Sequence, residues 1–203
     1  MTKRIIHVNP LHLEQLKKLS IFTTSDAAKF DITRAALSRA VEKGLIERLQ
    51  RGLYGYIGRE ESEMQSFAEV GVRAKKGVIC LLSALRYHNL TTEAPFQVWV
   101  CIRKGERAPK VDYPNIRIIR SRDTENIGII TTFIDGVPVL VTDAERTIVD
   151  CFKFRSKVGI DVAIAALSEA KQANKVDQGK LWKYAKHFRM TNIMMPYMEA
   201  IYA

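Results

Sequence analysis

Three carboxylates and an arginine fall within eight residues of one another, between Asp143 and Asp150. Nucleases and phosphotransferases use such clusters to hold magnesium, so Asp143, Glu145 and Asp150 are candidates for metal-assisted chemistry. The same segment also fits a helix start, because Thr142 and Glu145 stand at capping-box spacing directly after a predicted strand. Arg146 and Asp150 are four residues apart and can pair across one turn. We favour this structural interpretation, since no Gly-rich phosphate loop or ordered Ser/His/Asp set accompanies the carboxylates.

Cysteine and histidine could also carry chemistry, but their spacing does not suit it. The three cysteines are widely separated and form no Cys-x-x-Cys pair, which indicates a reducing cytoplasm rather than a disulfide framework or a zinc site. The histidines lack metal-ligand spacing. The longest apolar run, 162–167, is far shorter than a membrane span. We therefore predict a cytoplasmic protein with no catalytic residues, no metal, no cofactor and no membrane partner. The three cysteines are Cys80, Cys101 and Cys151, and the four histidines are His7, His12, His88 and His187.

The segment 22–57 has the pattern of two short helices followed by two strands. Thr24 or Ser25 is expected to cap a first helix that ends near residue 30, because a hydroxyl oxygen accepts from the free amides of a helix start. Thr33 is expected to cap a second helix over 34–43. Gly44 tolerates the left-handed conformation that ends a helix.

The second helix divides into an apolar side and a polar side. Leu37, Ala40 and Val41 share one side at about 100° per residue. A recognition helix needs such a split, with small or polar residues facing the DNA groove. Arg39 is the best candidate for a base edge, because its fork matches guanine O6 and N7. The predicted DNA-binding residues here are Thr33, Arg34, Ala35, Ser38, Arg39 and Lys43.

Residues 45–49 and 53–57 then have the composition of two strands, joined by the loop Gln50-Arg51-Gly52. Arg48 and Arg51 place positive charge at the tip of this hairpin, where it would meet phosphate or the minor groove. The order predicts a winged helix-turn-helix. An ordinary helical hairpin with a solvated charged face is the alternative, and winged helices also serve as protein-interaction modules.

Positive charge is concentrated at the N-terminal end of the chain. Residues 1–59 hold 11 Lys and Arg against 5 Asp and Glu, a net of +6 out of +10 for all 203 residues. This distribution is expected when one end binds a polyanion. Charge alone leaves RNA or an acidic protein open as the partner.

The remainder of the chain predicts a second domain, so we divide the chain into 1–59 and 60–203. Ser62 and Gln65 stand at capping-box spacing for a helix that runs to about 76, and 78–89 reads as a second helix. Four strands follow, over 96–103, 116–120, 127–133 and 137–141, with Asp135-Gly136 as a hairpin turn. The tail is helical, and Pro196 is expected to delay the start of its last helix. The predicted class is α+β: an N-terminal winged helix-turn-helix, then a mixed α/β domain with a small sheet and a helical tail.

A second basic cluster lies between residues 101 and 122, with seven Lys and Arg against two acidic residues. We favour solvated sheet edges, where charge prevents aggregation, over a second nucleic-acid surface or a site for an acidic partner. The candidate residues of this functional patch are Arg103, Lys104, Arg117, Arg120 and Arg122.

Three motifs together resemble the AbiEi-type antitoxins of bacterial type IV toxin–antitoxin systems, over roughly residues 11–190. They are the winged-helix ending Arg51-Gly52-Leu53-Tyr54, the segment 82–90 (LSALRYHNL) and the block 139–150 (VLVTDAERTIVD). The Glu-Arg-Thr-x-x-Asp part of the last block is the most specific of them.

The resemblance implies a protein of phage defence with two roles. The winged helix would repress the protein's own operon by binding promoter inverted repeats. The C-terminal domain would counter a nucleotidyltransferase-like toxin without a stable complex. Two other readings remain: a stand-alone regulator whose second domain dimerises or senses a small molecule, and an enzyme that uses the Asp143–Asp150 carboxylates.

Overall fold

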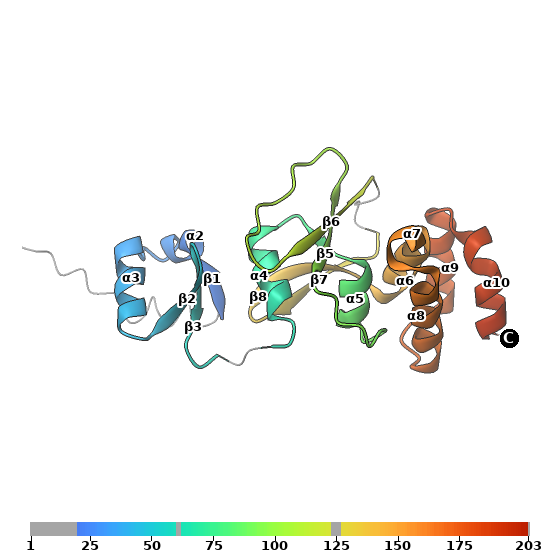
Figure 1. The fold of residues 1–203 in the computed structure, drawn as a ribbon, viewed down its shortest axis with the longest axis horizontal. Coiled ribbons are helices and arrows are strands. Elements are labelled where there is room, and N and C mark those ends of the chain that lie inside the picture. Colours follow the sequence, from blue (N-terminus) through green and yellow to red (C-terminus); the bar gives the residue numbers. More distant parts are fainter. Residues whose placement is uncertain (1–19, 60–61, 123–126, 203) are drawn as a thin grey trace, which may run out of the picture. The chain divides into compact units, whose positions relative to one another are not determined.

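The computed structural model describes residues 20–59, 62–122 and 127–202, so His7 and His12 lie outside the described residues. The fold is α+β, with a three-stranded and a five-stranded sheet (Figure 1). The described chain forms two compact units. The first contains the residues up to Arg73 and the segment Phe133–Val139, and the second contains Ala74–Thr132 and the residues from Leu140 onward.

The first unit begins with a strand, two helices and a hairpin. Its elements are β1 (Ile21–Thr23), α2 (Thr24–Ala28), α3 (Arg34–Glu42), β2 (Ile46–Gln50) and β3 (Leu53–Tyr56). The sheet order is β1-β3-β2, and both strand pairs are antiparallel. The predicted helix pair and hairpin are therefore present. Strand β1 was not predicted, because three residues give too short a pattern to distinguish from a loop.

The helix caps confirm one prediction and correct another. Thr33 accepts a hydrogen bond from the amide of Ala36 and caps α3 as predicted. The cap of α2 is Thr23, not Thr24 or Ser25. Its hydroxyl accepts from the Asp26 amide at 3.1 Å, and the Asp26 carboxylate accepts from the Thr23 amide at 3.1 Å. The capping box thus begins one residue early, where β1 ends.

Helix α4 (Gln65–Arg73) completes the first unit. The predicted capping box of Ser62 and Gln65 is absent: Ser62 Oγ accepts from the Met64 amide, while the Gln65 side chain donates to Glu69. A methyl group added to Gly71 would lie 2.9 Å from a Val139 methyl carbon, so glycine permits α4 to approach the segment Phe133–Val139 closely.

The five-stranded sheet has the order β6-β5-β4-β8-β7. Its strands are β4 (Val78–Ile79), β5 (Val98–Arg103), β6 (Ile116–Ser121), β7 (Ile129–Ile134) and β8 (Val137–Thr142). Asp135 and Gly136 both have positive φ, 49° and 73°, which confirms the tight turn between β7 and β8.

The predicted helix over 78–89 is wrong at its start. Val78 and Ile79 form β4, which pairs with both β5 and β8, and helix α5 covers only Leu81–Tyr87. An apolar run buried on all sides has no periodicity that distinguishes a short central strand from a helix, so only the pairing decided the assignment.

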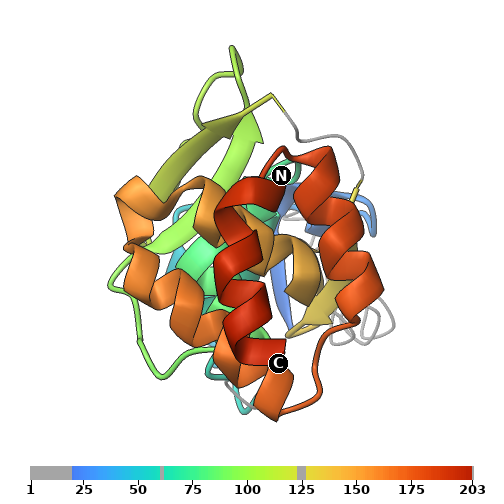
Figure 2. The same cartoon turned by 90° about the vertical axis from the view of Figure 1, so that its right-hand side faces the viewer.

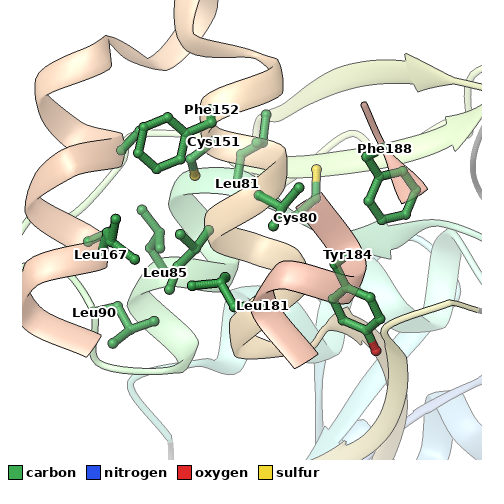
Figure 3. Packing of buried hydrophobic residues seen from close by; sticks show 14 of the residues in the cluster. Cys80, Leu81, Leu85, Leu90, Cys151, Phe152, Leu167, Leu181, Tyr184 and Phe188 are labelled. Carbon is green, nitrogen blue, oxygen red and sulfur yellow. The ribbon is translucent and has the colours of Figure 1, made fainter. Parts of the chain in front are cut away.

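Five helices follow the sheet: α6 (Ala144–Lys153), α7 (Arg155–Val158), α8 (Ile160–Gln172), α9 (Gln178–His187) and α10 (Thr191–Tyr202). Pro196 lies inside α10 and does not delay its start at Thr191. Figure 2 shows α8, α9 and α10 side by side. Their apolar faces join α5 and α6 in one core around Leu85, Phe152 and Leu167 (Figure 3).

Candidate nucleic-acid interface

Helix α3 presents an apolar face to its own unit and a polar face to solvent. Ala36, Leu37 and Ala40 are buried in a small core together with Phe22 and Ile46. The predicted contact residues on α3 and at its two caps are fully or partly exposed, namely Thr33, Arg34, Ala35, Ser38, Arg39 and Lys43. The burial of α3 therefore leaves these six side chains on its accessible surface.

The side chain of Arg39 is already oriented along α3. Its Nε donates to the carbonyl oxygen of Ala35 at 3.2 Å, one helical turn earlier. A hydrogen bond through Nε leaves the two terminal nitrogens of the guanidinium for other acceptors. Ala35 and Ser38 beside it are small and exposed, so an approaching molecule meets little steric obstruction at this surface.

The hairpin of β2 and β3 carries two of the predicted basic residues. Arg48 and Arg51 are both exposed. Gly52 has φ +75°, which confirms the left-handed position in the loop. The carbonyl of Gly52 accepts from the amide of Thr24 at 3.1 Å, so the loop is attached to the start of α2. The exposed charge of Arg51 therefore stands on an attached loop, and that of Arg48 on the strand before it.

The second basic cluster does not form one surface. Successive side chains of a strand point to opposite faces, so Arg117 and Arg120 on β6 are directed to opposite faces of the sheet. The Arg117 guanidinium lies 4.2 Å from the ring centroid of Trp99, its cross-strand neighbour. Arg103 is exposed at the end of β5, with Lys104 after it, and Arg122 is exposed after β6. Arg117 thus has a packing role that the sequence did not reveal.

The carboxylates of the segment 142–150 have partners within the chain. Asp143, not Thr142, caps α6: its Oδ1 accepts from the Arg146 amide at 2.8 Å. Thr142 is the last residue of β8, and its hydroxyl lies 2.7 Å from that of Thr147. Arg146 Nε donates to Asp150 at 2.7 Å, which confirms the predicted pair.

Two residues from α9 complete this polar cluster, and no sequence pattern predicted them. Lys180 Nζ lies 3.0 Å from Asp143 and 2.9 Å from Glu145. Burial alone would lower the pKa of Lys180, but the hydrogen bonds to both carboxylates raise it above its ordinary value. The Tyr184 hydroxyl donates to Asp143 at 3.1 Å. Burial is the larger cause that raises the pKa of Tyr184, and the negative charge of Asp143 raises it further. Asp143 and Glu145 therefore share one cation, the ammonium group of Lys180.

No group of three or more His, Cys, Asp and Glu side chains within residues 20–59, 62–122 and 127–202 is arranged to hold a metal ion. The three cysteines are all buried. No helix in the described part of the chain has both the length and the apolar character needed to cross a membrane. The candidate interface is the polar face of α3 together with the basic hairpin, because the predicted contact residues there are accessible.

The fold and this surface define an α+β protein in which the polar face of α3 and the basic hairpin are suited to a polyanionic partner. Residues 11–57 match the model of a family described as transcriptional regulator, AbiEi antitoxin. The match supports the AbiEi-type antitoxin family over residues 11–57, which contain the motif Arg51-Gly52-Leu53-Tyr54, while the segments 82–90 and 139–150 lie outside the matched residues. That family is one of regulators and is not a known enzyme class. A comparison with curated proteins found no match.

Proposed function

We propose that the chain is the antitoxin of a type IV toxin–antitoxin system and represses its own operon by binding promoter DNA. The order of α2, α3 and the β2–β3 hairpin is that of a winged helix-turn-helix, with α3 as the recognition helix. The observation that carries the proposal is the division of α3, whose apolar residues are buried while six potential contact residues remain accessible. The family match covers the same elements.

The two ends of the surface have different roles in this proposal. Arg39 reads a base edge, which discriminates between sequences. Arg48 and Arg51 contact phosphate or the minor groove, which contributes affinity for any duplex and a dependence on salt. Thr33, Arg34 and Lys43 support the backbone contacts at the two ends of α3.

Binding is tested by fluorescence anisotropy with the duplex upstream of the protein's own gene and a shuffled duplex of equal length. Arg39→Ala should cost about 1–3 kcal/mol on the promoter duplex alone. Arg51→Ala should weaken binding to both duplexes and reduce the salt slope by about one unit. Lys157→Ala in α7 removes the same charge from an exposed position of the second unit and serves as the control. If Arg39→Ala and Arg51→Ala both behave like Lys157→Ala, the assigned roles are wrong.

Protection from the toxin is assigned to residues 60–203, and the division of the two activities is part of the proposal. Helix α4 belongs to the first compact unit and contacts β1, so a fragment starting at residue 60 would expose the part of α4 that β1 covers. A full-length variant is the better test. Arg39→Glu with Arg51→Glu should abolish operator binding and still protect cells that co-express the adjacent gene. Loss of both activities in a folded variant would count against separable roles.

The alternative proposal is a stand-alone winged-helix regulator whose second unit dimerises or senses a small molecule. A nucleotidyltransferase reading frame beside the gene favours the antitoxin, and its absence favours the regulator. In either case we propose a cytoplasmic location, with duplex DNA as the partner. The toxin would be a functional partner that forms no stable complex with the chain.

A further inference from the structure

The loop Gln50-Arg51-Gly52 of the basic hairpin is held by side chains from helix α4. The Arg73 guanidinium donates to the carbonyl oxygen of Arg51 at 2.7 Å. The Gln50 amide donates to Glu69 Oε2 at 2.9 Å. Both contacts lie within the first compact unit and join residues about twenty positions apart in the chain. The loop therefore depends on residues beyond the helix pair and the hairpin.

Glu69 is itself fixed in place. It is only 5% exposed, and its other carboxylate oxygen accepts from the Gln65 amide at 3.3 Å. Burial raises the pKa of Glu69, while the hydrogen bonds from Gln65 and Gln50 and the charges of Arg59 and Arg73 oppose that rise. The Glu69 carboxylate accepts from two side-chain amides. Rotation of the carboxylate would break these hydrogen bonds in a buried site, so its position is fixed.

Each of the three backbone carbonyl groups of the loop accepts a hydrogen bond from an N–H group. Gln50 accepts from Arg48 Nε at 3.3 Å, Arg51 from Arg73 at 2.7 Å, and Gly52 from the Thr24 amide at 3.1 Å. The side chain of Arg51 is nevertheless exposed. The backbone of the loop is thus held on several sides while its charged side chain is directed to solvent.

We propose that Arg73 and Glu69 are positioning residues that pre-organise the loop, so that Arg51 meets duplex DNA without a further loss of backbone freedom. This inference rests on the proposed function, because it assumes that Arg51 contacts DNA. Ordering a residue on binding costs conformational entropy, and a loop already held in the bound geometry avoids that cost. In this proposal the part of the chain that DNA binding requires extends beyond residue 59 to the end of α4.

Glu69 provides a test in which positioning and simple electrostatics predict opposite results. Glu69→Ala removes a negative charge from a DNA-binding unit, so electrostatics alone would strengthen binding. Positioning predicts that the same variant binds both promoter and shuffled duplexes about 3- to 10-fold more weakly, equivalent to about 0.7–1.4 kcal/mol. Glu69→Gln retains an oxygen acceptor for the Gln50 amide and should restore most of the affinity.

Arg73→Ala should likewise weaken binding about 3- to 10-fold on both duplexes. Lys75→Ala is the matched control, since it removes the same charge from an exposed residue two positions after α4. Arg73→Lys keeps the positive charge and can still donate to the Arg51 carbonyl, so it should recover part of the loss. Hydrogen exchange of the peptide 48–56 should accelerate in Arg73→Ala and Glu69→Ala but not in Lys75→Ala.

A double-mutant cycle separates this inference from the proposed function. If Arg73 acts through the loop, Arg51→Ala with Arg73→Ala should bind little more weakly than Arg51→Ala alone. Additive losses, or a Glu69→Ala variant that binds as tightly as the wild type or more tightly, would overturn the inference. A wild-type chain that binds neither duplex would instead refute the proposed function. Gln50→Ala tests the same contact if Glu69→Ala fails to fold, and it should weaken binding in the same range.

Discussion

Replacement of Arg146 by alanine should strongly destabilise the second unit. Arg146 is 3% exposed, and its Nε donates to Asp150 at 2.7 Å. A terminal nitrogen donates to the carbonyl of Ile127 at 2.8 Å, and the guanidinium lies 3.8 Å from the ring centroid of Phe188. One side chain therefore joins the segment before β7, helix α6 and the C-cap of α9.

The expected loss is about 3–5 kcal/mol of unfolding free energy. This is the usual cost of removing one partner of a buried ion pair, because the remaining charge is left in a site from which water is excluded. The surface that Arg146 covers on Phe188 adds to the loss, whereas the exposed Arg107→Ala, which removes the same charge, should change stability by less than about 0.5 kcal/mol.

Tryptophan fluorescence during urea unfolding measures this loss selectively. The chain has two tryptophans, and both Trp99 and Trp182 pack in the core of the second unit. Arg146→Met combined with Asp150→Leu should be less destabilised than Arg146→Met alone, because the double variant leaves no uncompensated charge. An Arg146→Ala midpoint equal to that of Arg107→Ala would refute the structural interpretation of the block and favour the enzyme reading.

Four further perturbations test other parts of the molecule. Thr33→Ala removes the cap of α3 and should cost about 0.5–2 kcal/mol of stability together with a weaker affinity for promoter DNA, whereas Thr33→Ser should retain both. Burial lowers the pKa of His88 below its ordinary 6.5, so its contribution to stability is present above pH 6.5 and is lost as pH falls through the folded-state pKa. Urea unfolding between about pH 7.5 and pH 5 should show this loss in the wild type and a smaller one in His88→Gln, and equal losses would contradict the assignment. Arg120→Glu with Arg122→Glu tests the basic cluster: a functional patch predicts loss of protection from the toxin with unchanged tryptophan fluorescence, whereas the favoured solvated sheet edges predict unchanged protection. Arg117→Glu should in addition cost about 0.5–1 kcal/mol in the same unfolding assay, because it removes the cation over Trp99.

Local sequence determined the elements whose signals are contained within a few residues. The cap of α3 at Thr33, the left-handed glycines at 44 and 52, and the Asp135-Gly136 turn were all predictable. Each depends on the chemistry of one or two side chains and the backbone conformations they permit. The i,i+4 pair of Arg146 and Asp150 was predictable for the same reason.

Features that depend on residues distant in the chain were decided only by the tertiary structure. The assignment of Val78 and Ile79 to a strand required β5 and β8 as neighbours. The lysine that occupies the carboxylate cluster comes from α9, and the residues that hold the basic loop come from α4. A sequence specifies which groups need partners, since buried polar groups must be hydrogen-bonded, but packing decides which distant residue supplies each partner.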